Sequence, residues 1–249
     1  MKTRTILCLF VVLCFSLALF PQDANELISQ GDELYNEMKE MTAAKEALEK
    51  YHKAMLMMEK KYDAYWRIAR IMYYIGEYTD GKKEQQSIFS QGIYYAKKAV
   101  DEEPEKPDGY YWLGVNQGKY GEVKGVLKSL SLVKPIKNAM QKVIELDRSY
   151  EDGGPDRLLG RVYYKLPGFA GGSKDKSLEH LLKSLEYGPN DALTRLFLAD
   201  TYLSLKETDK ARAELDYILA MEDDPHWISG IEAVKEDARK TLQDKKFKE

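Results

Sequence analysis

The chain has 249 residues, of which 44% are hydrophobic and 32% charged, a composition typical of a foldable, soluble protein rich in helix-forming residues. Its 38 basic and 41 acidic residues are well mixed along the chain, so neither a nucleic-acid-binding field nor an acidic tail is expected. This length suits either one or two ordinary domains or one elongated array of repeats.

The first residues have the pattern of a secretory signal. Lys2 and Arg4 precede fifteen uncharged, mostly apolar residues, 6–20, and this run is too short to span a membrane comfortably. We therefore expect residues 1–24 to be a signal peptide. The protein is predicted to be exported to the periplasm.

Cleavage of the signal decides whether the exported chain keeps its two cysteines. Cleavage after either Ala18 or Ala24 removes both Cys8 and Cys14. The exported chain then has no disulfide, no thiolate zinc site and no cysteine nucleophile, and it is stabilised by packing alone. Two alternatives stay open, an uncleaved anchor and a lipoprotein acylated on Cys14. Association with a membrane is expected only in those two cases.

The rest of the chain repeats one pattern of a helix, a turn and an antiparallel helix. Leu113-Gly114 and Leu159-Gly160 each place a small residue where a second helix can cross closely. This is the pattern of tetratricopeptide (TPR) repeats, and it predicts an all-α, right-handed TPR-like solenoid. Within residues 25–249 we expect five helix pairs and a C-terminal capping helix: 25–58, 64–104, 108–147, 155–189, 192–223 and the cap 226–244.

The spacing of the repeats predicts that they are enlarged and degenerate. One small or apolar position recurs in the second helix of each pair, in steps of 45, 44, 41 and 34 residues by subtraction, at Ala54, Ala99, Val143, Ser184 and Ile218. Only the last step matches the TPR period of about 34 residues. We expect insertions between the paired helices at 79–87, 118–135 and 166–172, on a face that binds.

Two of these insertions suggest local structure. Segment 118–135 is predicted to contain an apolar helix that Pro135 ends. It either packs back on the array or borders a cavity or an oligomer interface. The glycine-rich segment 166–174 lacks the spacing of a phosphate-binding loop, and Ser173 is better explained as the N-cap of the next helix.

No catalytic residue, metal ligand or cofactor is predicted. His52, His180 and His226 lie in three different repeats without a metal-binding spacing, and acidic pairs fall at helix ends, where solvated charge is expected. The protein is therefore not expected to be an enzyme. A hydrolytic role stays open only as a third alternative, since a closed cavity could hold two facing carboxylates.

The concave face is the predicted binding site. Residues beside the packing positions of each first helix should point into a groove that combines aromatic, apolar and arginine side chains. Such a groove suits an amphipathic ligand with a carboxylate or an extended peptide, because arginine binds carboxylates through two hydrogen bonds. Alternatively, the tyrosines fill the interior and the arginines are solvated. The predicted members are Arg67, Ile71, Tyr74, Tyr111, Val115, Arg157, Arg161 and Tyr164.

Four segments resemble a known family, the T component of tripartite ATP-independent periplasmic (TRAP) transport systems. They are 111–116 (YWLGVN), 121–125 (Gly-x-x-Lys-Gly), 151–161 and 165–169 (KLPGF). The resemblance covers most of the chain after the signal. It implies an exported helical protein with degenerate TPR repeats, which pairs with a periplasmic substrate-binding P component and oligomerises around an apolar cavity. It supplies no catalytic residues.

The predicted function is therefore that of a non-catalytic accessory component of a TRAP-type solute transporter. The expected partners are a small amphipathic organic solute, the periplasmic substrate-binding protein, or both, and the protein is expected to form a homo-oligomer. The alternative is a general protein–protein interaction scaffold of the envelope with no transporter.

Overall fold

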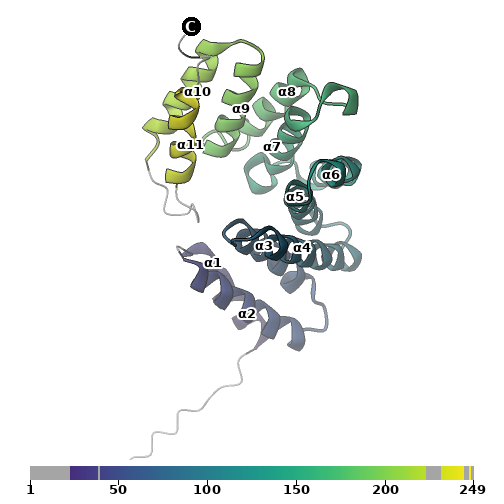
Figure 1. Ribbon diagram of the computed structural model, residues 1–249. Coiled ribbons are helices and arrows are strands. Elements are labelled where there is room, and N and C mark those ends of the chain that lie inside the picture. Colours follow the sequence, from purple (N-terminus) through teal and green to yellow (C-terminus); the bar gives the residue numbers. More distant parts are fainter. Residues whose placement is uncertain (1–22, 39, 223–230, 244–246, 248–249) are drawn as a thin grey trace, which may run out of the picture.

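The structure, a computed structural model, describes residues 23–38, 40–222, 231–243 and 247. Over this part of the chain it contains only helices, which follow one another in antiparallel pairs (Figure 1). The prediction of an all-α TPR-like solenoid is confirmed. The helices are α1 (Ala24–Asn36), α2 (Met41–Met57), α3 (Tyr62–Glu77), α4 (Lys82–Glu102), α5 (Pro107–Lys124), α6 (Val126–Asp147), α7 (Tyr150–Lys165), the 3-10 helix η1 (Gly168–Ala170), α8 (Lys174–Leu185), α9 (Ala192–Ser204), α10 (Thr208–Ala220) and α11 (Glu232–Leu242).

Some predictions fall outside the described residues. Of the expected signal peptide, residues 1–22 are not described, and neither are residues 223–230, which include His226. No helix of the described part is both long enough and apolar enough to cross a membrane.

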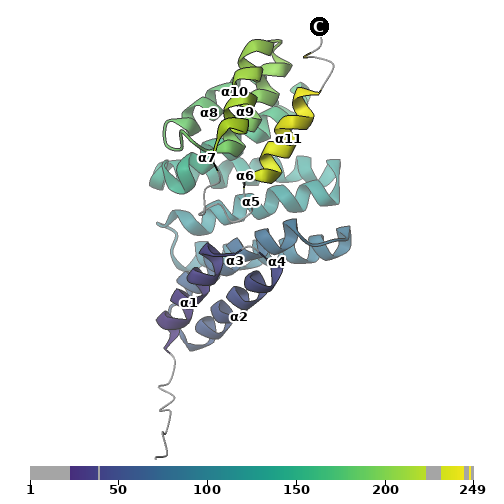
Figure 2. The ribbon, with the colours of Figure 1, turned by 90° about the vertical axis from the view of Figure 1, so that its left-hand side faces the viewer.

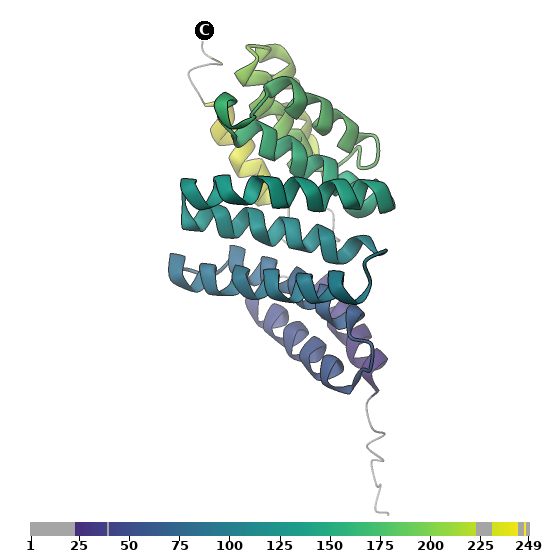
Figure 3. The ribbon, with the colours of Figure 1, turned by 90° about the vertical axis from the view of Figure 1, so that its right-hand side faces the viewer.

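The pairs stack into a curved array. The first helices α3, α5 and α7 face its open side, and α1 and α11 lie at the two ends of that opening (Figures 1 and 2). The second helices α4, α6 and α8 form the opposite, outer side (Figure 3). Helix α11 packs on α10 and α9, where Ala238 is buried against the end of the array.

The core consists of three successive clusters rather than one centre. Tyr51 and Ile71 belong to the first cluster, between α1, α2 and α3. Trp112 and Met140 belong to the middle cluster, between α3 and α7. The third joins α8 to α11 and includes Leu215. Each cluster is made by neighbouring helix pairs, as expected of a solenoid in which each repeat contacts only its neighbours.

One close crossing ties three helices together. Gly92 of α4 lies against the carboxamide of Asn116 on α5. That side chain is fully buried, and its Nδ2 donates to the carbonyl oxygens of Ala69 on α3, at 3.0 Å, and of Trp112, at 2.8 Å. A side chain larger than glycine at position 92 would occupy the space of the amide.

The first two expected insertions lengthen helices instead of forming long connections. Four residues separate α3 from α4, which begins at Lys82, and Gly125 alone separates α5 from α6. The expectation that Pro135 ends the apolar segment is wrong, because α6 continues through it to Asp147. Proline removes only one backbone donor, and Met140 and Val143 beyond it are buried in the middle cluster.

The third insertion forms a short turn. Residues 166–173 contain η1, and the hydroxyl of Ser173 accepts a hydrogen bond from the backbone N–H of Lys176 at 3.2 Å. The predicted N-cap of α8 is therefore confirmed. Because η1 leaves Phe169 uncovered, this turn also presents an aromatic ring to solvent.

Candidate functional site

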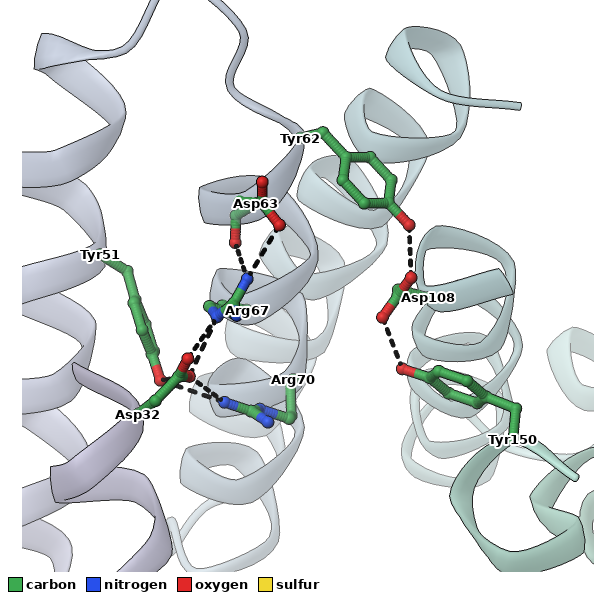
Figure 4. Close-up of polar contacts among 8 residues, drawn as sticks. All are labelled: Asp32, Tyr51, Tyr62, Asp63, Arg67, Arg70, Asp108 and Tyr150. Carbon is green, nitrogen blue, oxygen red and sulfur yellow. Dashed lines mark hydrogen bonds and ion pairs between the residues drawn. The ribbon is translucent and has the colours of Figure 1, made fainter. Parts of the chain in front are cut away.

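A half-buried ion-pair cluster joins the first two helix pairs (Figure 4). The Arg67 Nε of α3 lies 2.9 Å from Oδ2 of Asp32 on α1, and Arg70 Nη2 lies 2.8 Å from Oδ1. The hydroxyl of Tyr51 donates to the same Oδ1 at 2.9 Å. Burial raises the pKa of the Tyr51 phenol, so it stays protonated as a donor. The predicted groove residue Arg67 therefore has its charge paired within the fold.

A second cluster links α3, α5 and the start of α7. The hydroxyl of Tyr62 donates to Oδ2 of Asp108 at 2.5 Å, and that of Tyr150 donates to Oδ1 at 3.1 Å (Figure 4). Burial, together with the adjacent Asp108 carboxylate, raises the pKa of both phenols. These groups hold neighbouring repeats together through neutral donors and one charged acceptor.

The predicted arginines of α7 are also paired. Arg157 Nη1 lies 3.0 Å from Oδ2 of Asp191, and its Nη2 donates to the hydroxyl of Tyr111 at 3.1 Å. Arg161 Nη1 lies 2.7 Å from Oδ2 of Asp200 on α9. Burial raises the pKa of Tyr111 to about 12, although Arg157 acts in the opposite direction. Both arginines thus connect α7 to the following helix pair.

The other predicted residues differ in accessibility. Ile71 has no exposed surface and belongs to the first core cluster, so it cannot contact a partner. Val115 is half-buried against the middle cluster. The ring of Tyr74 lies 4.7 Å from that of Tyr78, and Lys174 Nζ lies 3.7 Å from the ring centre of the half-buried Tyr164. Of the eight predicted residues, only Arg161 lines the pocket described next.

A pocket of about 520 Å³ lies between α5, α6 and α7. Its size falls within the range of sites that hold small molecules or the side chains of a partner. Segment 118–135 supplies much of the wall, so this segment borders a cavity. The lining is mostly apolar, from Val126, Leu130, Val133, Ile136, Leu158, Val162, Leu166 and Pro167, with the polar residues Gln117, Glu122, Ser129, Arg161 and Lys165.

Gln117 gives this pocket an unsatisfied polar atom. Its side chain is only 6% exposed, and its carboxamide oxygen is buried without a hydrogen-bond partner among the described residues. A buried acceptor without a donor has lost its hydrogen bonds to water, and no protein group replaces them. This destabilises the fold by about 1–3 kcal/mol. The oxygen has almost no accessible surface of its own, so a ligand that brings an N–H or O–H group would satisfy it only once the side chain turns toward the cavity.

Two exposed apolar side chains lie close in the chain to residues that line the pocket. Leu127 is 87% exposed at the start of α6, next to the lining residue Val126. Phe169 is 91% exposed on η1, two residues after the lining residue Pro167. Large apolar groups this exposed, each within two residues of a lining residue, indicate a surface that another molecule covers.

The same region is locally basic. Residues 118–137 contain five lysines and one acidic residue, and residues 157–174 contain four cationic residues and no acidic one. Lys124, Lys128 and Lys165 are exposed, and none has a carboxylate within ion-pair distance in the described part of the chain. Sequence reasoning missed this patch because it weighed charge over the whole chain, whereas a count in short windows would have found it.

The histidines and acids do not gather. Among residues 23–38, 40–222, 231–243 and 247, no three His, Cys, Asp or Glu side chains form a group that could hold a metal ion. His180 instead lies 2.7 Å from Oδ1 of the buried Asp156 and stacks on Tyr163. His52 is half-buried beside Tyr95.

Solved structures that resemble this fold include two TPR proteins. A thermophilic TPR protein from Thermus thermophilus, TTC0263, superposes with a TM-score of 0.65 and 17% identity, over 87% of this chain and 98% of that one. YrrB, described as a TPR protein with an unusual peptide-binding site, has a TM-score of 0.49 and 19% identity, over 90% of this chain and 93% of that one. No curated protein sequence matches significantly. The likeness to TTC0263 shows a TPR-type fold.

The family profile covers the helices that build the pocket. The profile described as "Regulator of microtubule dynamics protein 1-3" matches residues 27–167, which is more than half of the chain. All the residues that line the pocket lie within the matched region. The chain therefore belongs to the family of regulator of microtubule dynamics proteins 1–3.

Proposed function

We propose that this protein is a non-catalytic TPR scaffold that holds a partner at the pocket between α5, α6 and α7, as the accessory component of a TRAP-type solute transporter. The observation that carries the proposal is the pocket itself, about 520 Å³ in volume with a mostly apolar lining and one unsatisfied acceptor. The partner is a small amphipathic organic solute, the periplasmic substrate-binding protein, or both.

The composition of the pocket supports holding a ligand without transforming it. Of its ionisable lining residues, Arg161 is paired with Asp200, and Glu122 lies 3.9 Å from Lys119 on the same helix. Neither forms a hydrogen-bonded pair with Lys165. General acid–base catalysis needs groups positioned on a common reacting atom, and this lining offers none.

The transporter part of the proposal rests on the resemblance between residues 108–174 and the T components of TRAP systems. That stretch supplies the walls of the pocket, so the resemblance and the cavity fall on the same residues. The N-terminal segment with the pattern of a secretory signal supports export to the periplasm. Homo-oligomerisation is part of the same proposal.

The second candidate is a protein-interaction scaffold with no transporter. The family match favours it, because the name of that family refers to proteins that regulate microtubule dynamics. On this alternative, the same TPR surface binds a protein partner and retains no solute.

Native mass spectrometry of the protein purified gently from its own host tests the two candidates. The transporter role predicts a homo-oligomer that carries an organic solute or a periplasmic binding protein, and Val133→Trp, which narrows the pocket, should lose it. Leu56→Trp, at an exposed site on α2, is the matched control. A bare monomer would contradict the transporter role, and co-sedimentation with polymerised tubulin would then support the second candidate.

A further inference from the structure

The surface around the pocket is larger than a small molecule needs. A solute held inside the cavity would contact its lining but would leave Leu127 and Phe169, which do not belong to the lining, in water. These two side chains belong to different elements, the start of α6 and the turn η1. A polypeptide segment that crosses the mouth could cover both and place one apolar side chain in the cavity.

The positive charge around the mouth of the pocket favours an acidic partner. Lys124 and Lys128 flank the start of α6, and Lys165 ends α7, all three exposed and without an ion-pair partner in the described residues. Glu122 is the only acidic residue of the lining. A partner with carboxylates on either side of its apolar residues complements this field, whereas a basic partner is repelled.

The orphan acceptor favours a peptide over a purely apolar ligand. The carboxamide oxygen of Gln117 is buried at the pocket and has no donor among the described residues. A hydrocarbon chain would leave it unsatisfied, while a peptide carries a backbone N–H at every residue except proline. Four features of this surface therefore favour the same ligand, an acidic peptide with apolar side chains. They are the cavity, the two exposed apolar side chains, the lysines around the pocket and Gln117.

From these observations we infer that the pocket between α5, α6 and α7 binds an acidic, amphipathic segment of a partner protein. One large apolar side chain of the segment occupies the cavity, and a backbone N–H donates to the carboxamide oxygen of Gln117 once that side chain turns toward the cavity. This inference rests on the proposed function in that the segment belongs to the protein which the scaffold holds. It names the occupant as a peptide rather than a solute.

Fluorescence anisotropy with the full chain tests the inference. The probe is a labelled synthetic peptide in which leucine and phenylalanine alternate with glutamate, compared with the same peptide carrying lysine in place of glutamate. We expect the acidic peptide to bind and its affinity to fall as salt rises. Equal binding of the basic peptide would overturn the inference.

Two sets of variants locate the site. Leu127→Ser with Phe169→Ser should weaken the acidic peptide by about tenfold or more, because two exposed apolar contacts are lost. Lys124→Gln, Lys128→Gln and Lys165→Gln together should lower the affinity and flatten its salt dependence. The matched controls are Leu56→Ser with Met57→Ser, and Lys82→Gln, Lys83→Gln and Lys97→Gln, exposed residues elsewhere. Unchanged binding by both sets of site variants would overturn the inference.

The variant Gln117→Met distinguishes an effect on peptide affinity from an effect on the stability of the free protein. It removes the orphan acceptor with little change in volume, so the free protein should be as stable as the wild type or more stable. Peptide affinity should nevertheless fall. A variant that binds the peptide as the wild type does would remove Gln117 from the site.

Two further outcomes are distinguishable. If vesicles of phosphatidylcholine and phosphatidylserine in equal parts bind the chain in a manner that needs Leu127 and Phe169, while the peptide does not bind, the surface contacts a membrane and the inference fails. If the peptide binds but native mass spectrometry shows neither solute nor transporter partner, the transporter role fails and the peptide site stands.

Discussion

At the scale of single residues, the cationic side chains of the array divide into two groups. Arg67 and Arg70 share the carboxylate of Asp32, and Arg161 binds Asp200, so these charges hold helices together. The lysines at the mouth of the pocket have no such partner among the described residues. An arginine paired within the fold has given up the hydrogen bonds that recognition would use, whereas an unpaired exposed lysine still attracts acidic groups.

Asp156 is a fully buried carboxylate that is held by two cationic or hydrogen-bonding partners. Its side chain has no exposed surface and contacts Arg148, at 2.7 Å, and His180, also at 2.7 Å. Burial by itself would raise the pKa of Asp156, but the hydrogen bonds from His180 and Arg148 outweigh it and lower the pKa. The carboxylate is therefore ionised in the folded protein at neutral pH.

We expect Asp156→Asn to lower the free energy of unfolding by about 2–3 kcal/mol, because Arg148 and His180 lose a charged acceptor. Because folding lowers this pKa, the ionised form stabilises the protein above about pH 4, and that stability is lost as the pH falls through the folded-state pKa. Urea denaturation at pH 7 and at pH 3 should show the difference from wild type narrowing in acid.

Asp101→Asn, at an exposed acid of α4 without an ion pair in the described part of the chain, is the control and should change stability by no more than about 0.5 kcal/mol. A loss for Asp156→Asn that is the same at both pH values would show that the carboxylate is not the source of the stability.

At the scale of elements, the enlarged repeats are lengthened helices. Helices α4 and α6 have 21 and 22 residues, whereas α9 and α10 of the regular last repeat have 13 each. Each added turn brings more residues of a helix into contact with its neighbour, so a longer helix packs over a longer stretch. The contact of Gly92 with Asn116 lies in such a stretch, and it joins α4 to α5 and, through Ala69, to α3.

Gly92→Ala should destabilise the protein by about 1–3 kcal/mol, because its methyl group would overlap the amide of Asn116, which two hydrogen bonds hold in place. Gly118→Ala is the matched control, since that glycine is also helical and no heavy atom lies within 4 Å of the added carbon. It should stabilise the protein by up to about 1 kcal/mol. Thermal unfolding of the two variants would contradict this account if both moved the midpoint in the same direction.

At the scale of the whole molecule, stability is divided among three clusters in series. The first and third clusters share no residue, and the middle cluster lies between them along the chain. In a solenoid each repeat is stabilised mainly by its neighbours, so a local defect spreads only to adjacent repeats.

Leu215→Ala, which empties a fully buried position of the third cluster, should cost about 2–5 kcal/mol. Hydrogen exchange should accelerate in α8 to α11 and change little in α1 to α3. Ile71→Ala, in the first cluster, should give the reverse pattern. Equal acceleration along the whole chain in either variant would mean that the array unfolds as a single cooperative unit.

Much of the fold could be predicted because it depends on local spacing. Apolar and small residues three and four positions apart define helical faces, and five such pairs in succession predict a solenoid whatever the details of their contacts. Ser173 could be predicted as a cap for the same reason, since its partner is only three residues away. The prediction that Pro135 ends a helix is wrong because the packing of the residues beyond it keeps α6 helical.

The candidate site could be predicted only in part. The sequence by itself determined a TPR-like helical array, the position of the enlarged third repeat and the apolar character of segment 118–135, because all of these are properties of neighbouring residues. The tertiary structure decided which arginines are paired, since Asp32 and Arg67 are 35 positions apart and Arg161 and Asp200 are 39 apart. It also decided that Ile71 is buried and that Gln117 lacks a donor at the pocket among the described residues. Such facts depend on which helices meet, and a repeat pattern gives each helix its buried face but does not state which side chain lies opposite another.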